Sequence, residues 1–213
     1  MLSNHIHSAL DQVRMLRQLL LERQRFRGYS GEARIFSGFV AASAACVLTF
    51  GHFSDTPQVH LTAWLIVFVL ALFINYGAVM YWFLNDPVVS RDWRKLKPTI
   101  DVFPPLIVGA IFSIAMILKG DYSYLFAIWM CLYGLANLAS RHVLPGMIGG
   151  VGILYIITGA FCLFSPHVGF TSPWAMGVTF LVGETIAGLI LRIDQHRNLN
   201  FEQESNHSLT GDC

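Results

Sequence analysis

The chain has 213 residues, of which 54% are hydrophobic and only 13% are charged, and its mean hydropathy is +0.55. Soluble domains of this size rarely carry so few charges, so the composition excludes an ordinary soluble domain and favours a membrane protein. The formal net charge of +1 says nothing by itself about partners, because in membrane proteins the distribution of charge matters more than its sum.

Residues 1–30 form a basic segment that we expect on the cytoplasmic side of the membrane. Apolar residues recur there at spacings of three and four, which predicts an amphipathic helix; they are Ile6, Leu10, Val13, Leu16 and Leu20. Arg14, Arg17 and Arg23 lie on the remaining surface, where they can contact anionic lipid headgroups. Two roles remain open for this helix: an anchor on the inner leaflet, or a docking or dimerisation helix for a partner.

Six apolar stretches follow, and each is long enough, or nearly so, to cross the roughly 30 Å hydrocarbon core as a helix. They cover residues 33–51, 62–84, 102–119, 123–140, 145–165 and 173–192. Ser30 is placed to cap the first of them, with Glu32 in the favourable first turn. The expected fold is an all-α, six-transmembrane-helix bundle over residues 31–194, followed by a polar tail, residues 195–213, that we expect to be disordered.

The basic residues predict the orientation of this bundle. Of the fourteen Lys and Arg residues, all but Lys119 fall before the first span, in the even-numbered loops or after the last span. By the positive-inside rule, both termini are then cytoplasmic, and we expect the bacterial inner (plasma) membrane. The loop between spans two and three carries Arg94, Lys95 and Lys97, which we expect at the lipid headgroups.

A weak internal repeat suggests three tandem helical hairpins. Residues 102–109 and 143–150 both open an outward-running span and share Val, Pro, Ile and Gly in register. The returning spans each carry Trp near the outer end and a polar residue further in; the pairs are Trp64 with Asn75, Trp129 with Asn137, and Trp174 with Glu184. Convergence of unrelated apolar spans on interfacial Pro and Trp is the competing explanation.

Small residues four positions apart indicate where helices approach closely. The pairs are Gly38 with Ala42, Gly109 with Ser113, and Gly146 with Gly150. Such strips are typical of helix packing in membranes, so we interpret them as packing surfaces rather than ligand sites.

Glu184 is the main candidate for a functional residue. It lies ten positions after Trp174 and eight before Arg192, which places it near the bilayer midplane. No Lys or Arg is expected at that depth, so the carboxyl should be protonated much of the time and hydrogen-bond to a polar side chain; the candidates are Asn75, Thr158 and Tyr155. The carboxyl is then either a proton- or cation-binding site, with Asn75 and Asn137 as further binding residues, or an interhelical hydrogen bond.

No catalytic, metal or cofactor motif is recognisable. His52, His60 and His167 match no zinc spacing and are expected to be solvated loop residues, and the four cysteines form no C-x-x-C pair. We therefore expect no enzyme, no cofactor and no nucleic-acid partner; the expected partners are the lipid bilayer, its anionic headgroups, and a second copy or another membrane protein. Two functions remain: a small transporter or channel-like protein using Glu184, and a non-catalytic accessory or scaffold subunit that docks a partner through the N-terminal helix.

Overall fold

The structure is a computed structural model that describes residues 28–85, 96–100, 102–165 and 168–210, and all regular secondary structure in these ranges is helical. The all-α prediction is therefore confirmed for the described residues. Each predicted span coincides with one long helix, and two short helices lie between them. The elements are α2 (Gly31–Phe50), α3 (Pro57–Asn85), α4 (Lys97–Ile100), α5 (Phe103–Lys119), α6 (Leu125–Ala139), η2 (Ser140–His142), α7 (Met147–Phe164) and α8 (Pro173–Thr210).

Four helices are long and apolar enough to cross a membrane: α2, α3, α7 and the Pro173–Arg197 part of α8. Only 11% of the apolar window of α3 is buried inside the protein, so most of its apolar surface faces outward, as lipid contact requires. The apolar helices α5 and α6 are shorter, with 17 and 15 residues. The described chain is therefore a helical membrane protein with at least these four helices of spanning length.

Local sequence explains where the helices begin and end. The Ser30 side chain accepts a hydrogen bond from the Ala33 amide at 3.3 Å, and Glu32 lies in the first turn of α2, so the predicted N-cap is confirmed. Two prolines open α5, where a missing amide hydrogen costs nothing, and α5 ends at Gly120 with φ of 71°, a left-handed conformation that favours glycine.

Several predicted segments fall partly or wholly outside the described residues. These are the amphipathic helix with Arg14, Arg17 and Arg23, and the loop positions Arg94 and Lys95. Lys97 is the first residue of α4. The segment that we expected to be a disordered tail is helical through Thr210, because α8 continues well past residue 194.

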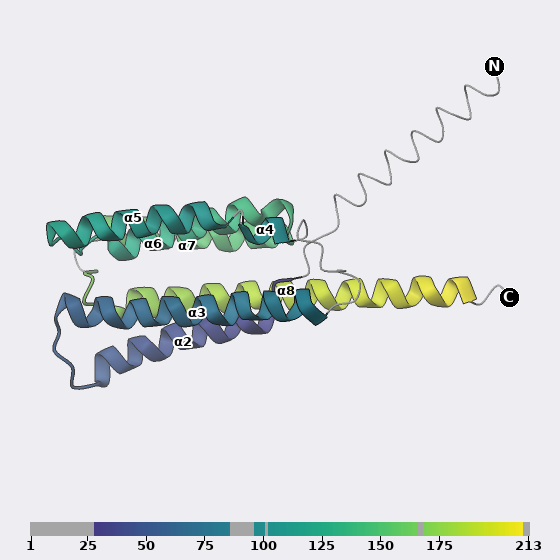
Figure 1. Cartoon of the computed structure of the whole chain (residues 1–213), viewed down its shortest axis with the longest axis horizontal. Coiled ribbons are helices and arrows are strands. Elements are labelled where there is room, and N and C mark those ends of the chain that lie inside the picture. Colours follow the sequence, from purple (N-terminus) through teal and green to yellow (C-terminus); the bar gives the residue numbers. More distant parts are fainter. Residues whose placement is uncertain (1–27, 86–95, 101, 166–167, 211–213) are drawn as a thin grey trace, which may run out of the picture.

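Figure 1 shows the long helices in two groups, α2 with α3 and α8, and α5 with α6 and α7. The most extensive packing is between α2 and α8 and between α6 and α7, and α7 and α6 join the two groups by contacting α8. These closest pairs are not the successive pairs of the predicted hairpins. The three-hairpin arrangement is therefore not confirmed and stays a prediction.

Glycines allow both of the closest helix pairs to form. A Cβ atom at Gly134 of α6 would lie 2.6 Å from the Gly152 carbonyl oxygen of α7, and one at Gly152 would lie 2.7 Å from the Gly134 carbonyl oxygen. Gly31 and Gly188 make the same reciprocal contact between α2 and α8. Backbones can meet this closely only where no side chain intervenes, so these four glycines set the helix crossings.

The predicted small-residue strips behave differently from one another. Gly38 packs on the backbone of α8, and Gly109 accommodates the Trp129 ring, whose Nε1 donates to Ser113 Oγ at 2.9 Å. The prediction that Gly146 and Gly150 form a packing strip is wrong, because a Cβ atom added at either glycine meets nothing within 4 Å. On α7 the packing glycines are instead Gly152 and Gly159, which lie on another face.

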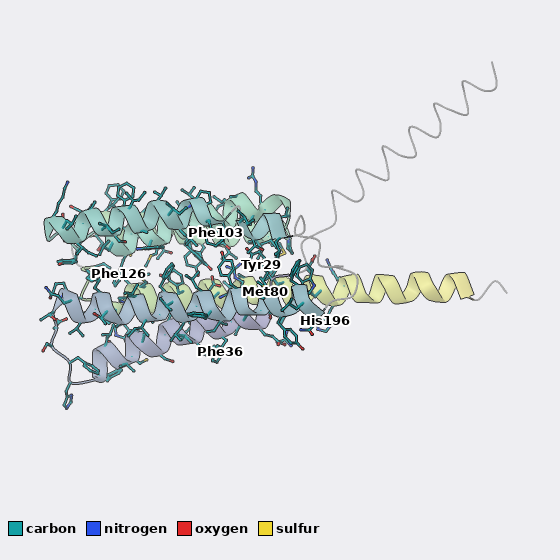
Figure 2. The ribbon with its side chains drawn as sticks, viewed as in Figure 1. Tyr29, Phe36, Met80, Phe103, Phe126 and His196 are labelled. Atoms are coloured by element: carbon teal, nitrogen blue, oxygen red, sulfur yellow. The ribbon has the colours of Figure 1, made fainter. Side chains whose placement is uncertain are left out.

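Two clusters of buried side chains fill the bundle, one toward each end (Figure 2). Near the start of α2, the cluster includes Ile148, Tyr155 and Ala187. At the opposite end, where α2 leads into α3, the second cluster is rich in aromatic rings, including Trp64, Phe126 and Phe170. Trp64 is only 7% exposed and therefore packs in the core of the bundle.

A buried ion pair as the candidate functional site

Arg34 and Glu184 lie opposite each other where α2 packs on α8. Arg34 is in the first turn of α2 and is 6% exposed, whereas Glu184, within α8, is 2% exposed. Gly38, one turn after Arg34, makes the approach possible, because a Cβ atom there would lie 3.0 Å from the Glu184 Cβ. Arg34 therefore reaches Glu184 from the side of the bundle where α2 begins.

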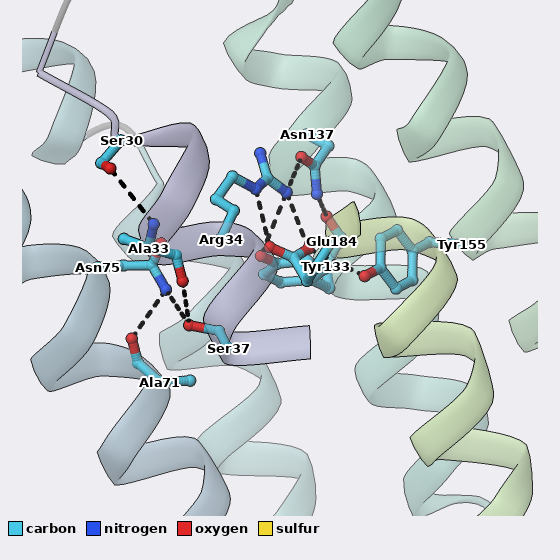
Figure 3. A network of polar contacts seen from close by, with 10 residues as sticks. All are labelled: Ser30, Ala33, Arg34, Ser37, Ala71, Asn75, Tyr133, Asn137, Tyr155 and Glu184. Carbon is cyan, nitrogen blue, oxygen red and sulfur yellow. Dashed lines mark hydrogen bonds and ion pairs between the residues drawn. The ribbon is translucent and has the colours of Figure 1, made fainter. Parts of the chain in front are cut away.

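The two side chains form a bidentate ion pair (Figure 3). Arg34 Nε donates to Glu184 Oε2 at 2.8 Å, and Arg34 Nη2 donates to Glu184 Oε1 at 2.9 Å. Two parallel N–H···O bonds match the planar guanidinium to the planar carboxylate, which is the strongest arrangement available to such a pair.

Three further side chains from α6 and α7 complete what we call the ion-pair network. Tyr155 donates its hydroxyl to Glu184 Oε1 at 2.9 Å, and Arg34 Nη2 donates to Asn137 Oδ1 at 2.9 Å and, more weakly, to Tyr133 Oη at 3.4 Å. Asn137 Nδ2 in turn donates to the Tyr133 carbonyl oxygen. The ion-pair network, Arg34, Tyr133, Asn137, Tyr155 and Glu184, thus joins α2, α6, α7 and α8.

Packing holds the two tyrosines of this network in place. Gly183 precedes Glu184, and a Cβ atom there would lie 2.5 Å from the Tyr155 hydroxyl oxygen, so only glycine lets that hydroxyl reach the carboxylate. The rings of Tyr133 and Tyr155 meet edge to face with centroids 5.0 Å apart, and Phe180 packs against both.

The structure corrects the prediction that Glu184 has no cationic partner. Arg34 was counted among the basic residues that precede the first span, but it lies inside α2 and its guanidinium contacts the carboxylate. A long arginine side chain near a helix end can extend along the bundle by several ångströms, which an estimate from sequence position ignores. The expectation of a protonated acid therefore loses its premise, because it rested on the absence of a cationic partner.

The polar residues predicted near Glu184 differ in their hydrogen-bond partners. Tyr155 bonds the carboxylate, as predicted. Asn75 instead donates to Ser37 Oγ at 2.8 Å and to its own helix at the Ala71 carbonyl oxygen, and Thr158 donates to the Leu154 carbonyl oxygen. Asn137 belongs to the network through Arg34, so of the two candidate asparagines only Asn137 joins the site of Glu184.

The predicted loop histidines also differ. His52 is exposed, as predicted, and His167 lies outside the described residues. His60 is instead the fourth residue of α3 and is only 3% exposed. Within the described part of the chain, no three His, Cys, Asp or Glu side chains gather as a metal site would require.

No family model, no curated protein and no solved structure matches this chain. The ion-pair network is the candidate functional site of the described residues. Each member donates to or accepts from another member, and the two charges neutralise each other inside an apolar bundle. Chemically, the arrangement orders four helices around one fixed pair of charges.

Proposed function

We propose that the chain is a six-span integral membrane protein with a closed core. We propose further that the protein is a non-catalytic accessory or scaffold subunit. The observation that carries this proposal is that both Glu184 oxygens are already bonded by Arg34 and Tyr155 inside the bundle. A carboxylate committed in this way binds no transported proton or cation unless Arg34 first moves away. A fixed polar network is instead suited to holding helices in one register.

Six crossings are supported by the packing of the two shorter helices. At about 1.5 Å per residue, α6 alone is about 22 Å long, but η2 continues it directly. Helix α5 packs against α6, and α6 packs along α7, which is itself long enough to span a membrane. Because α5 and α6 are apolar and run beside a spanning helix, they have no polar surface that would favour a position in water, so they are expected to cross the membrane too.

The basic residues support an orientation with both termini in the cytoplasm. Single cysteines introduced at Asp55 and at Lys95, in a background without the native cysteines, test it. An impermeant maleimide applied to intact cells should label the Asp55→Cys chain, and the Lys95→Cys chain should be labelled only after the membrane is opened. The reverse pattern would rule out this orientation.

Proton flux separates the scaffold from the transporter. Intramembrane charges often line ion pathways, so the Arg34–Glu184 pair also favours transport as the second candidate function. In proteoliposomes loaded with a pH-sensitive dye, a scaffold leaves proton flux at the level of empty liposomes in the wild type and in Glu184→Gln. If instead the wild type shows flux that is lost in Glu184→Gln and kept in Glu32→Gln, that result would establish transport and contradict the scaffold proposal.

The role of the N-terminal helix needs a separate test, because it lies outside the described residues. A peptide of residues 1–27 should bind anionic vesicles, and replacement of Arg14, Arg17 and Arg23 by Glu should release it if the helix is an electrostatic anchor. Retained binding would show that its arginines are not what holds it at lipid.

A further inference from the structure

The C-terminal part of α8 runs beyond the helix bundle. The apolar part that is long enough to span a membrane ends at Arg197, but the helix continues to Thr210, which adds about 20 Å at the usual helical rise. Figure 1 shows this part of α8 passing the ends of the other described helices. We call residues 198–210 the α8 extension. Its sequence contains Glu202 and Glu204 but no Lys or Arg, so the α8 extension is acidic.

The start of the described chain lies beside the point where this extension begins. Gln195 Nε2 donates to the Tyr29 carbonyl oxygen at 3.3 Å, and the Gly31–Gly188 contact belongs to the same antiparallel crossing of α2 and α8. Residues 1–27 lie outside the described residues, but they join the chain just before Tyr29. They therefore leave the bundle at the same end as the α8 extension and next to it.

Residues 1–27 and the α8 extension carry opposite charges. The side chains of residues 1–27 have a formal net charge of +3, because five arginines outnumber two acidic residues; these are Arg14, Arg17, Arg23, Arg25 and Arg27 against Asp11 and Glu22. The α8 extension has a formal net charge of −2. Single ion pairs at a surface are weak, but a short connection between two segments gives a high effective concentration, which favours their association.

The helix face of α8 that contacts Tyr29 continues into the α8 extension. Leu199 and Glu202 follow Gln195 at spacings of four and seven, which places these three residues on one face of α8. That face thus has an apolar position followed by an acidic one. The amphipathic helix predicted for residues 1–27 has the complementary pattern, an apolar stripe flanked by arginines.

We propose that the α8 extension is the docking surface for residues 1–27 of the same chain. In the docked form, arginines of residues 1–27 pair with Glu202 and Glu204, and the contact between Tyr29 and Gln195 holds the two segments close together. This docking is independent of the scaffold proposal, because neither segment belongs to the ion-pair network.

The distance between two spin labels in the full-length protein tests this docking. The labels are attached at Gln18→Cys and Asn206→Cys in a background without the native cysteines. The protein is reconstituted at one copy per nanodisc, so that a second copy cannot supply the docked segment, and the lipid includes anionic headgroups as a competing partner for the arginines. We expect a narrow population of short distances in this doubly labelled protein.

Charge reversal identifies what holds the labelled segment. Arg17→Glu with Arg23→Glu reverses charges in residues 1–27, and Glu202→Arg with Glu204→Arg reverses those of the α8 extension. Each pair of substitutions alone should lower the short-distance population by at least about threefold, because attractions become repulsions. The combination of all four should restore this population. It is the matched control, since its total charge equals that of the wild type.

Three results would overturn the docking. The first is the absence of short distances in the doubly labelled protein without charge reversals. The second is a short-distance population that both reversed variants keep. The third is a combined variant that does not restore the population lost on reversal of the arginines, because anionic lipid and not the α8 extension would then hold residues 1–27.

Discussion

The ion-pair network and the aromatic cluster, at opposite ends of the bundle, differ in how they accommodate buried polar atoms. Near the start of α2, four buried polar or charged side chains and the half-buried Tyr133 hydrogen-bond one another across four helices. At the other end, the aromatic rings of Trp64, Phe126 and Phe170 form the core, with centroids 5.6 Å and 4.8 Å apart along that series. There, Trp64 Nε1 and His60 Nδ1 are buried without a partner among the described residues.

This difference shows which end fixes the arrangement of the helices. Hydrogen bonds and ion pairs are directional, so the ion-pair network accepts only one register of α2 against its neighbours. Aromatic packing is more tolerant of small shifts, because dispersion contacts depend weakly on direction. We therefore expect substitutions in the ion-pair network to cost more than comparable substitutions at the aromatic end.

The largest effect is expected from Glu184→Gln, which should lower the free energy of unfolding by about 3–5 kcal/mol because it leaves the buried Arg34 charge uncompensated. Titration with SDS in mixed micelles measures this quantity. Glu32→Gln is the matched control, since that exposed carboxyl lies in the same region of α2 without contacting the network. If both variants unfold like the wild type, the ion pair does not stabilise the bundle.

Gly134→Ala is expected to cost about 1–3 kcal/mol, because its Cβ would meet the backbone of α7 and push apart the helices that carry Asn137 and Tyr155. Gly146→Ala makes the same change near the start of α7 in open space, so it should unfold like the wild type. Equal stability of the two variants would contradict the claim that the close crossing of α6 and α7 requires glycine at position 134.

Tyr155→Phe removes one hydrogen bond to Glu184 while keeping the ring, and we expect a loss of about 1.5–2 kcal/mol. The same SDS titration applies. Thr158→Val removes a hydroxyl from the same helix that bonds only its own backbone, and it should cost clearly less. A cost for Thr158→Val as large as that for Tyr155→Phe would show that the Tyr155 bond has no special role.

The smallest effect is expected at the aromatic end. His60→Phe removes the unpartnered Nδ1 together with a bond to the mostly exposed Asp55, so the two consequences oppose each other and the change should stay within about 0.5 kcal/mol. If His60→Phe lowered the free energy of unfolding as much as Tyr155→Phe does, the proposed difference between the two ends would be contradicted.

Sequence reasoning located the helices and the most important carboxyl but not its partner. Apolar runs long enough to cross a membrane give helices reliably, because no other regular structure buries the backbone polar groups of a single segment in lipid. Glu184 was identifiable because a carboxyl within such a run is rare and costly. Arg34 was missed because it stands at the edge of a span, where arginine usually contacts headgroups, and because its partner is 150 positions away in the chain.

A signal for Arg34 was nevertheless present in α2. Gly38, Ala41 and Ala45 follow Arg34 at spacings of four, seven and eleven, which places all four residues on one helix face, and all four are buried. A cation on the face that small residues mark for close packing is expected inside the bundle. By contrast, the unpartnered Nδ1 of His60 has no signature in sequence, because it depends on which distant residues, such as Phe170, pack against the start of α3.

A double-mutant cycle on Arg34 and Glu184 tests the central claim, that these two side chains form one stabilising unit, most directly. The variants are Arg34→Leu, Glu184→Leu and the double replacement, each measured by SDS titration in mixed micelles. Each single replacement should cost about 3–5 kcal/mol, because it leaves one buried charge alone, whereas the double replacement should cost no more than either single one. The predicted coupling is thus at least about 3 kcal/mol. Additive costs, with a double variant that loses the sum of the two single losses, would contradict the claim.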